Sequence, residues 1–275
     1  DNKMGSFCKH FLLSLIFVGF LQGCGGGGGT GSPPINLAAG VYTTTANGAE
    51  TWAFLAPTID SQTPNWYAIN FASGSVHPDL YSAFQTGVGT SASTVTVTKH
   101  FLGTATTGNV SMTMPSTGSL SSTLTFSDNS VLPQSWVTNQ LVTTVYDPTQ
   151  VAANLSALKT WSGTWYFGNN TSALDLQIAS NLMIDPGVAI LGCKFNSLLL
   201  NPVSGFNVYK ATLTIAYNTT NTYPNSNCLL SNSNQVDSTY QGLAFLLNQP
   251  AGKTTLYIMV VGGNQKGLFF KGIQP

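Results

Sequence analysis

Residues 94–98 read Thr-Val-Thr-Val-Thr, and residues 66–71 read Trp-Tyr-Ala-Ile-Asn-Phe. The first stretch alternates polar and apolar side chains, which is the period of a β-strand with one buried face. The second is rich in aromatic and β-branched residues, which favour strands. Similar stretches recur from Gly40 onward, separated by Gly, Ser, Asn and Pro clusters. We therefore expect further strands at Trp52–Phe54, Ser122–Phe126, Thr164–Phe167, Ala173–Ile178, Asn207–Tyr217, Gly242–Leu247, Thr255–Val261 and Leu268–Phe270.

The pattern predicts an all-β fold with two small antiparallel β-barrel or sandwich domains in tandem. Seven or eight short strands in each half suit this architecture. Gly40-Val41-Tyr42 opens the first half as Gly163-Thr164-Trp165 opens the second, each with a glycine and an aromatic entering a strand. This similarity favours duplicated barrels, and one large sandwich or two unrelated halves are the alternatives.

A boundary between the halves is predicted at residues 146–160, the one stretch with helical spacing. Val151, Leu155 and Leu158 stand at i, i+4 and i+7. We expect a linker with a short helix there, between a first β domain at 40–145 and a second at 161–275.

The amino-acid composition argues against some classes of binding partner. Charged residues make up 7% of the 275-residue chain, against about 25% in typical proteins. All nine basic residues are lysines, and nine acidic residues balance them. Because nucleic-acid binding depends on clustered Lys and Arg that neutralise phosphates, we expect no nucleic-acid partner. A hydrophobic content of 43% argues against a disordered chain.

The N-terminal residues 1–23 have the pattern of a signal peptide. Lys9 and His10 precede an apolar run at Phe11–Leu21. This run is too short to cross the roughly 30 Å hydrocarbon layer of a membrane. We therefore expect a cleaved signal peptide rather than a transmembrane helix.

The sequence Leu21-Gln22-Gly23-Cys24 resembles the lipobox of bacterial lipoproteins. That resemblance implies cleavage before Cys24 and acylation of this cysteine, followed by a Gly- and Pro-rich tether at 24–39. An ordinary cysteine after a conventional cleavage site is the alternative. Gly25 is not the Asp that commonly retains such lipoproteins in the inner membrane, so the expected location is the outer membrane, with the lipid as anchor.

The second half contains a series of short motifs: Gly163-Thr164-Trp165, Gly192-Cys193, Asn207-Val208-Tyr209, Cys228, Gly242-Leu243-Ala244-Phe245 and Leu268-Phe269-Phe270. In this series it resembles a group of proteobacterial β-barrel lipoproteins without an assigned activity. That resemblance implies a β-barrel lipoprotein and adds nothing about chemistry.

The four cysteines differ in context. Cys8 belongs to the signal peptide and Cys24 to the lipobox, which leaves Cys193 and Cys228 as a pair in an oxidising compartment. We expect them to form a structural disulfide, and two separately buried thiols are the alternative. A zinc site is not expected, because the second half contains no histidine.

Catalytic residues are not expected, and neither is a cofactor. His77-Pro78-Asp79 has the composition of a turn before a strand, and His100 is the other histidine beyond the signal peptide. The Gly-x-Ser-x-Gly pattern of hydrolases does not occur. We also expect no pair of catalytic carboxylates, because Glu50 is the only glutamate and the aspartates are scattered along the sequence. We therefore expect no enzyme activity.

The aromatic residues Trp52, Trp66, Tyr67, Trp165 and Tyr166 are the candidate ligand-binding residues. They have the chemistry to line a barrel mouth or to stack on sugars. The alternative is that they fill small cores, as aromatics in strands usually do. The expected function is that of an outer-membrane-anchored, non-catalytic binding or interaction module with a protein or glycan partner. The alternative is a lipocalin-like carrier, which needs a dry cavity for a small apolar ligand.

Overall fold

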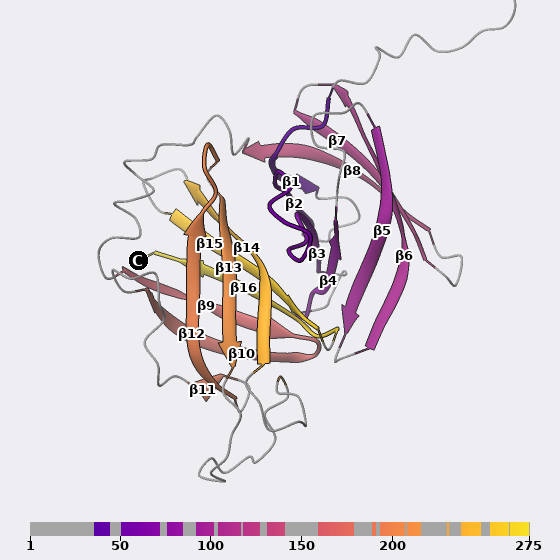
Figure 1. Cartoon of the computed structure of the whole chain (residues 1–275). Helices are drawn as coiled ribbons and strands as arrows, with labels where there is room; N and C mark the ends of the chain where they lie inside the picture. Colours follow the sequence, from indigo (N-terminus) through magenta and orange to yellow (C-terminus); the bar gives the residue numbers. More distant parts are fainter. Residues whose placement is uncertain are drawn as a thin grey trace, which may run out of the picture. The chain divides into compact units, whose positions relative to one another are not determined.

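All regular elements of the described chain are β-strands, arranged in two antiparallel sheets (Figure 1). The all-β fold class predicted from the alternation is confirmed. No helix in this part of the chain is long and apolar enough to cross a membrane. The computed structural model describes residues 36–44, 51–71, 76–84, 92–101, 104–116, 118–126, 131–140, 159–178, 189–190, 193–206, 208–215, 230, 238–248, 254–263 and 265–274.

The first sheet is a closed barrel in which each strand pairs with the next. The last strand returns to the first, with Tyr42 opposite Thr138 and an irregularity after Val41. Its interior contains buried apolar side chains that include Tyr42, Trp66 and Tyr81. The strands are β1 (Gly40–Thr44), β2 (Thr51–Leu55), β3 (Trp66–Asn70), β4 (Asp79–Ala83), β5 (Ala92–Phe101), β6 (Thr104–Ser116), β7 (Ser119–Phe126) and β8 (Val131–Gln140).

The second sheet also has eight strands, and its first strand pairs with its last, as β1 pairs with β8. It differs from the barrel in being open, because β10 and β11 stand at the two ends of the strand order. Eight strands in each half agree with the predicted number. The strands are β9 (Lys159–Phe167), β10 (Asn170–Ile178), β11 (Ala189–Ile190), β12 (Cys193–Pro202), β13 (Val208–Ile215), β14 (Ser238–Asn248), β15 (Thr254–Gly262) and β16 (Gly267–Ile273).

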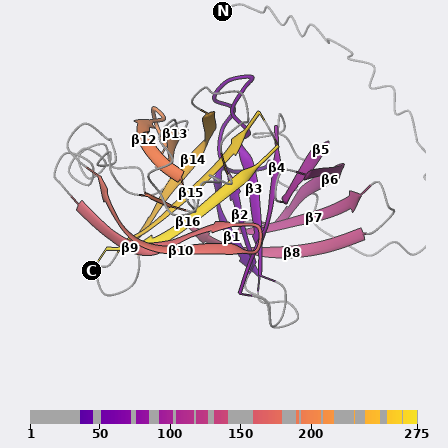
Figure 2. The ribbon, with the colours of Figure 1, turned by 90° about the horizontal axis from the view of Figure 1, so that it is seen from below.

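The outer face of β1–β4 packs against one face of β13–β16, and we call this contact the seam (Figures 1 and 2). Successive strand residues point to opposite faces, so Trp66 enters the barrel core while Tyr67 enters the seam. In β15, Ile258 lies in the core of the second sheet and Tyr257 in the seam. Burial on both faces explains why these strands are nearly continuous apolar runs, whereas β5 alternates with exposed threonines.

Aromatic rings dominate the seam. The ring centroids of Phe54 and Phe245 are 5.2 Å apart, as are those of Phe54 and Tyr257. Trp52 also lies 5.2 Å from Tyr257. An ion pair crosses between the sheets as well, with the Lys210 Nζ 2.6 Å from an Asp60 carboxylate oxygen. The two halves therefore share a hydrophobic contact in addition to their separate cores.

Every strand predicted from the sequence coincides with an observed strand, and β9 begins at Lys159. The short helix predicted at Val151–Leu158 lies outside the described residues, as do the signal peptide at 1–23 and Cys24. At the end of the predicted tether at 24–39, Leu37 is buried in the barrel core.

Candidate functional site

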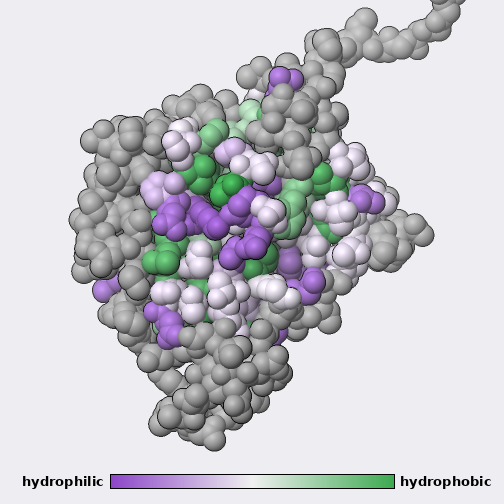
Figure 3. Space-filling model, in the orientation of Figure 1, coloured by the Kyte–Doolittle hydropathy of each residue, from purple (hydrophilic) through white to green (hydrophobic). Residues whose placement is uncertain are grey.

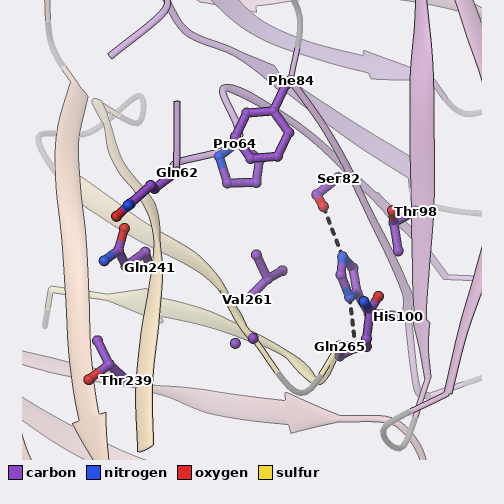
Figure 4. Close-up of a pocket in the computed structure, with 12 residues that line it drawn as sticks. Gln62, Pro64, Ser82, Phe84, Thr98, His100, Thr239, Gln241, Val261 and Gln265 are labelled. Atoms are coloured by element: carbon purple, nitrogen blue, oxygen red, sulfur yellow. Dashed lines mark hydrogen bonds between the residues drawn. The ribbon is translucent and has the colours of Figure 1, made fainter. Parts of the chain in front are cut away.

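A pocket of about 390 Å³ opens where the barrel meets the second sheet (Figure 4). This volume is within the range of small-molecule sites. Hydrophilic residues gather near the middle of the face drawn in Figure 3. The barrel contributes Gln62, Pro64, Ser82, Phe84, Thr98 and His100, and the second sheet contributes Thr239, Gln241, Val261, Gly262, Gly263 and Gln265.

The lining combines uncharged polar groups with one exposed aromatic ring. Amide and hydroxyl side chains predominate, and these groups both donate and accept hydrogen bonds. Phe84 is 47% exposed, which is unusual for so large an apolar side chain among the described residues. Within the same part of the chain, the buried Oε1 atom of Gln241 has no hydrogen-bond partner. The pocket therefore suits a neutral, polar ligand.

Strand pairing in the barrel brings Ser82 and His100 together. Ser82 on β4 is opposite Thr98 on β5, and His100 follows Thr98 by two residues on the same outer face. The Ser82 Oγ lies 2.8 Å from the His100 Nε2. Both residues are largely buried but line the pocket (Figure 4).

The other ring nitrogen of His100 is held by the second sheet. Its Nδ1 lies 2.8 Å from the backbone carbonyl oxygen of Gln265, in the turn between β15 and β16. Gln265 is the only non-glycine residue with positive φ in the described chain, at 66°. Two backbone hydrogen bonds close the turn: Gln265 N–H to the Gly262 carbonyl and Gly262 N–H to the Lys266 carbonyl.

These contacts determine the proton positions on His100. A carbonyl oxygen only accepts hydrogen bonds, so the Nδ1 carries a proton. Burial lowers the pKa of His100 below its ordinary value, although the hydrogen bond to Gln265 acts in the opposite direction. The ring is therefore neutral at pH 7, its Nε2 is unprotonated, and the Ser82 hydroxyl donates to it.

The loop before β3 is fixed by Asp60. One carboxylate oxygen accepts the backbone N–H groups of Gln62 and Thr63 at 2.9 and 2.7 Å. The other accepts a hydrogen bond from Lys210 on β13, and this contact holds the pKa of Asp60 far below its usual range. The pocket residue Gln62 is therefore positioned by contacts from both sheets.

Replacing Gly267 by alanine is expected to displace the turn from His100. A Cβ at Gly267 would lie 2.6 Å from the Leu80 Cδ2 and 2.9 Å from the His100 Cβ, so the contacting atoms have to move. Increased exposure of the ring should then raise the His100 pKa toward its ordinary value. An NMR titration of the histidine measures this change.

Gly263→Ala is the matched control in the same turn, because a Cβ there would have no atom of the described residues within 4 Å. This variant should leave the His100 titration as it is in the wild type. Identical titration curves for Gly267→Ala and the wild type would contradict the prediction.

No protein-family model matches this chain, and neither does any curated protein or solved structure. The geometry of the pocket is therefore what indicates a function for this chain.

The predicted ligand-binding aromatics are distributed over three environments, and none of the five lines the pocket. Trp66 packs in the barrel core and Trp165 in the core of the second sheet. Tyr67 is buried in the seam, where Trp52 and Tyr166 are partly buried. For Trp66, Tyr67 and Trp165, the positions agree with the alternative that aromatics fill cores.

Of the remaining predicted residues, the described ones, His77 and Cys193, do not line the pocket. His77 lies in a bend that precedes β4, as its sequence context predicted. Cys193 begins β12 and is buried, whereas Cys228 is outside the described residues. Among the described side chains, no group of three His, Cys, Asp or Glu residues is placed to hold a metal ion.

The pairing of Ser82 with His100 is not predicted from the sequence, because Ser82 does not stand in a Gly-x-Ser-x-Gly motif. A weaker signal was present in the alternation itself. Continuing the polar positions of Thr94-Val95-Thr96-Val97-Thr98 by two residues reaches His100, so this histidine shares their face. The partner strand and its register are not visible in the sequence.

Proposed function

We propose that this protein is a lipid-anchored module of the outer membrane that binds a neutral, polyhydroxylated ligand, such as an uncharged glycan. The observation that carries the proposal is the pocket lined by six amide and hydroxyl side chains, including Gln62, Gln241 and Thr98, beside the exposed ring of Phe84. Sugars present hydroxyl groups that need such partners and apolar faces that stack on aromatic rings. The role is binding, without turnover.

The uncharged lining of the pocket supports a neutral ligand. None of the pocket-lining residues in the described chain is Lys, Asp or Glu, and His100 is neutral at pH 7. A charged ligand would lose hydration without gaining an opposite charge. The scarcity of charged residues and the lack of arginine in the sequence also argue against a nucleic-acid partner.

The large side chains in the barrel core support surface binding over the lipocalin-like alternative. A carrier of that kind would hold an apolar ligand inside the barrel. Here the buried side chains of Tyr42, Trp66 and Tyr81 occupy the interior. The pocket outside the barrel is polar instead.

Anchoring is proposed from the sequence Leu21-Gln22-Gly23-Cys24, with lipid on Cys24. Each buried methylene of an acyl chain contributes about 0.8 kcal/mol, so two or three chains hold a protein on a membrane. The absence of Asp after the cysteine favours the outer membrane.

We also propose a structural disulfide between Cys193 and Cys228. Cys193 is buried in the core of the second sheet, which also contains Leu230. The Tyr240 hydroxyl donates a 2.6 Å hydrogen bond to the Leu230 carbonyl and fixes the chain there. Cys228 precedes this fixed point by two residues, a reach of at most about 7 Å.

A vesicle-flotation experiment tests the anchor and the pocket separately. The acylated full chain is reconstituted into vesicles and mixed with fluorescent neutral oligomers of glucose, galactose and N-acetylglucosamine, with a sialylated oligomer for comparison. We expect the chain to float with a neutral oligomer but not with the sialylated one. Cys24→Ser should prevent flotation of the chain while leaving glycan binding in solution intact.

Phe84→Ala should leave the chain on the vesicles and lower its affinity for the glycan about tenfold, equivalent to about 1.4 kcal/mol. Leu199→Ala is the control, because Leu199 is also an exposed apolar side chain but does not line the pocket. Flotation of Cys24→Ser would contradict the anchor. Failure of every neutral oligomer to bind would contradict the glycan pocket.

A further inference from the structure

The hydrogen-bonded chain from Ser82 through His100 to the Gln265 carbonyl has the order of a nucleophile, a base and an orienting group. The two distances are both 2.8 Å. In such an arrangement the neutral imidazole receives the hydroxyl proton while the third group fixes the ring and its tautomer. A backbone carbonyl takes here the place that a carboxylate occupies in many enzymes.

We propose that Ser82 is a reactive nucleophile that accepts the acyl group of an ester whose alcohol is uncharged. The inference concerns the same pocket as the proposed function but does not depend on the ligand's being a glycan. It goes beyond reversible binding, because the acyl group becomes covalently attached to the protein. The reaction ends at the acyl-serine and is stoichiometric.

The acyl transfer requires only the ester, Ser82 and His100. The Ser82 Oγ attacks the ester carbonyl carbon as its proton passes to the His100 Nε2. When the bond between this carbon and the alcohol oxygen breaks, the imidazolium returns the proton to that oxygen. The products are an acyl-serine, a free alcohol and a neutral His100.

Two features of the site favour this step. Thr98, opposite Ser82 in the strand pairing, lines the same pocket, and its hydroxyl is the proposed donor to the oxygen that becomes negatively charged. Gln265 holds its carbonyl toward His100 in a backbone conformation that non-glycine residues seldom adopt. Such strain persists only where the surrounding structure imposes it, and it concentrates at functional sites.

The uncharged lining selects the substrate class. His100 is the only titratable side chain among the pocket-lining residues of the described chain. Esters of neutral alcohols, including O-acylated sugars, therefore fit better than charged esters. A volume of about 390 Å³ accommodates a short acyl chain together with a small alcohol.

p-Nitrophenyl acetate is the probe, applied to the full chain in detergent. We expect a burst of about one p-nitrophenolate per chain, with one acetyl group on Ser82 in peptide mass spectrometry. Ser82→Ala should lose this adduct, and His100→Gln should slow its formation at least about 100-fold. The control is Ser111→Ala, because Ser111 is an exposed serine whose hydroxyl bonds Thr94 at 2.9 Å on the barrel surface.

A pH profile of the wild type gives a readout that does not depend on the folding of a variant. Acylation should slow as the pH falls through the His100 pKa, because a protonated Nε2 no longer accepts the serine proton. Equal acylation of Ser82 in His100→Gln, a rate independent of pH between 4 and 8, or no adduct on Ser82 would each overturn the proposal. Glycan retention is measured separately, so loss of binding with intact acylation overturns only the binding role.

Discussion

Replacing Phe54 by alanine is expected to lower the free energy of unfolding by about 3–5 kcal/mol. Phe54 is fully buried in the seam, and its ring contacts those of Phe245 and Tyr257. Truncation removes the buried ring and leaves a cavity that the strands on both sides are too constrained to fill. Guanidinium denaturation followed by tryptophan fluorescence measures the loss, in a Cys24→Ser background that keeps the chain in solution.

Phe84→Ala is the matched control for this substitution. The same side chain is removed, but Phe84 is 47% exposed, so the expected loss is about 0.5 kcal/mol or less. Because both variants lose a phenyl ring, the difference between their stabilities measures the effect of burying that ring. If the two variants unfolded at the same denaturant concentration, the seam would not contribute to stability as we describe.

Loss of the disulfide between Cys193 and Cys228 should cost about 3–4 kcal/mol, because it frees a loop of about 35 residues in the unfolded chain. The Cys193→Ala variant, the Cys228→Ala variant and the double variant should therefore have similar stabilities. Reductant should lower the melting temperature of the wild type but not that of the double variant.

Separately buried thiols would behave differently from a disulfide. The effects of the two single substitutions would then add in the double variant, because independent sites contribute independently. Insensitivity of the wild type to reductant would also contradict the bond.

The strands were predictable because each carries its own signal. Thr94–Thr98 alternates because β5 has one exposed face, and Trp66–Ile69 is continuously apolar because β3 is buried on both faces along these residues. The sequence does not show which faces of the two sheets pack together. The seam between Phe54 and Phe245 depends on contacts between residues nearly 200 positions apart.

The pocket was less predictable than the strands. The role of His100 depends on the register that places Ser82 opposite Thr98 and on the turn at Gln265, and the sequence shows neither. The five aromatic residues predicted to bind a ligand lie in the two cores and the seam. Phe84, the aromatic residue of the pocket, stands at the end of a strand without a distinctive motif.

Pairing of the first and last strands in each half has a consequence for the order of folding. Val41 pairs with Gln140, and Tyr166 with Phe269, so the first and last strands of each half are joined by residues about 100 positions apart. Contacts of such long sequence separation form slowly, because the entropy of closing a long loop is lost before the contact is made. When the chain is synthesised from its N-terminus, β1 lacks one of its pairing partners until β8 has been made. The outer face of β1–β4 then stays uncovered until β13–β16 have followed, so native packing is completed only when the last strand arrives.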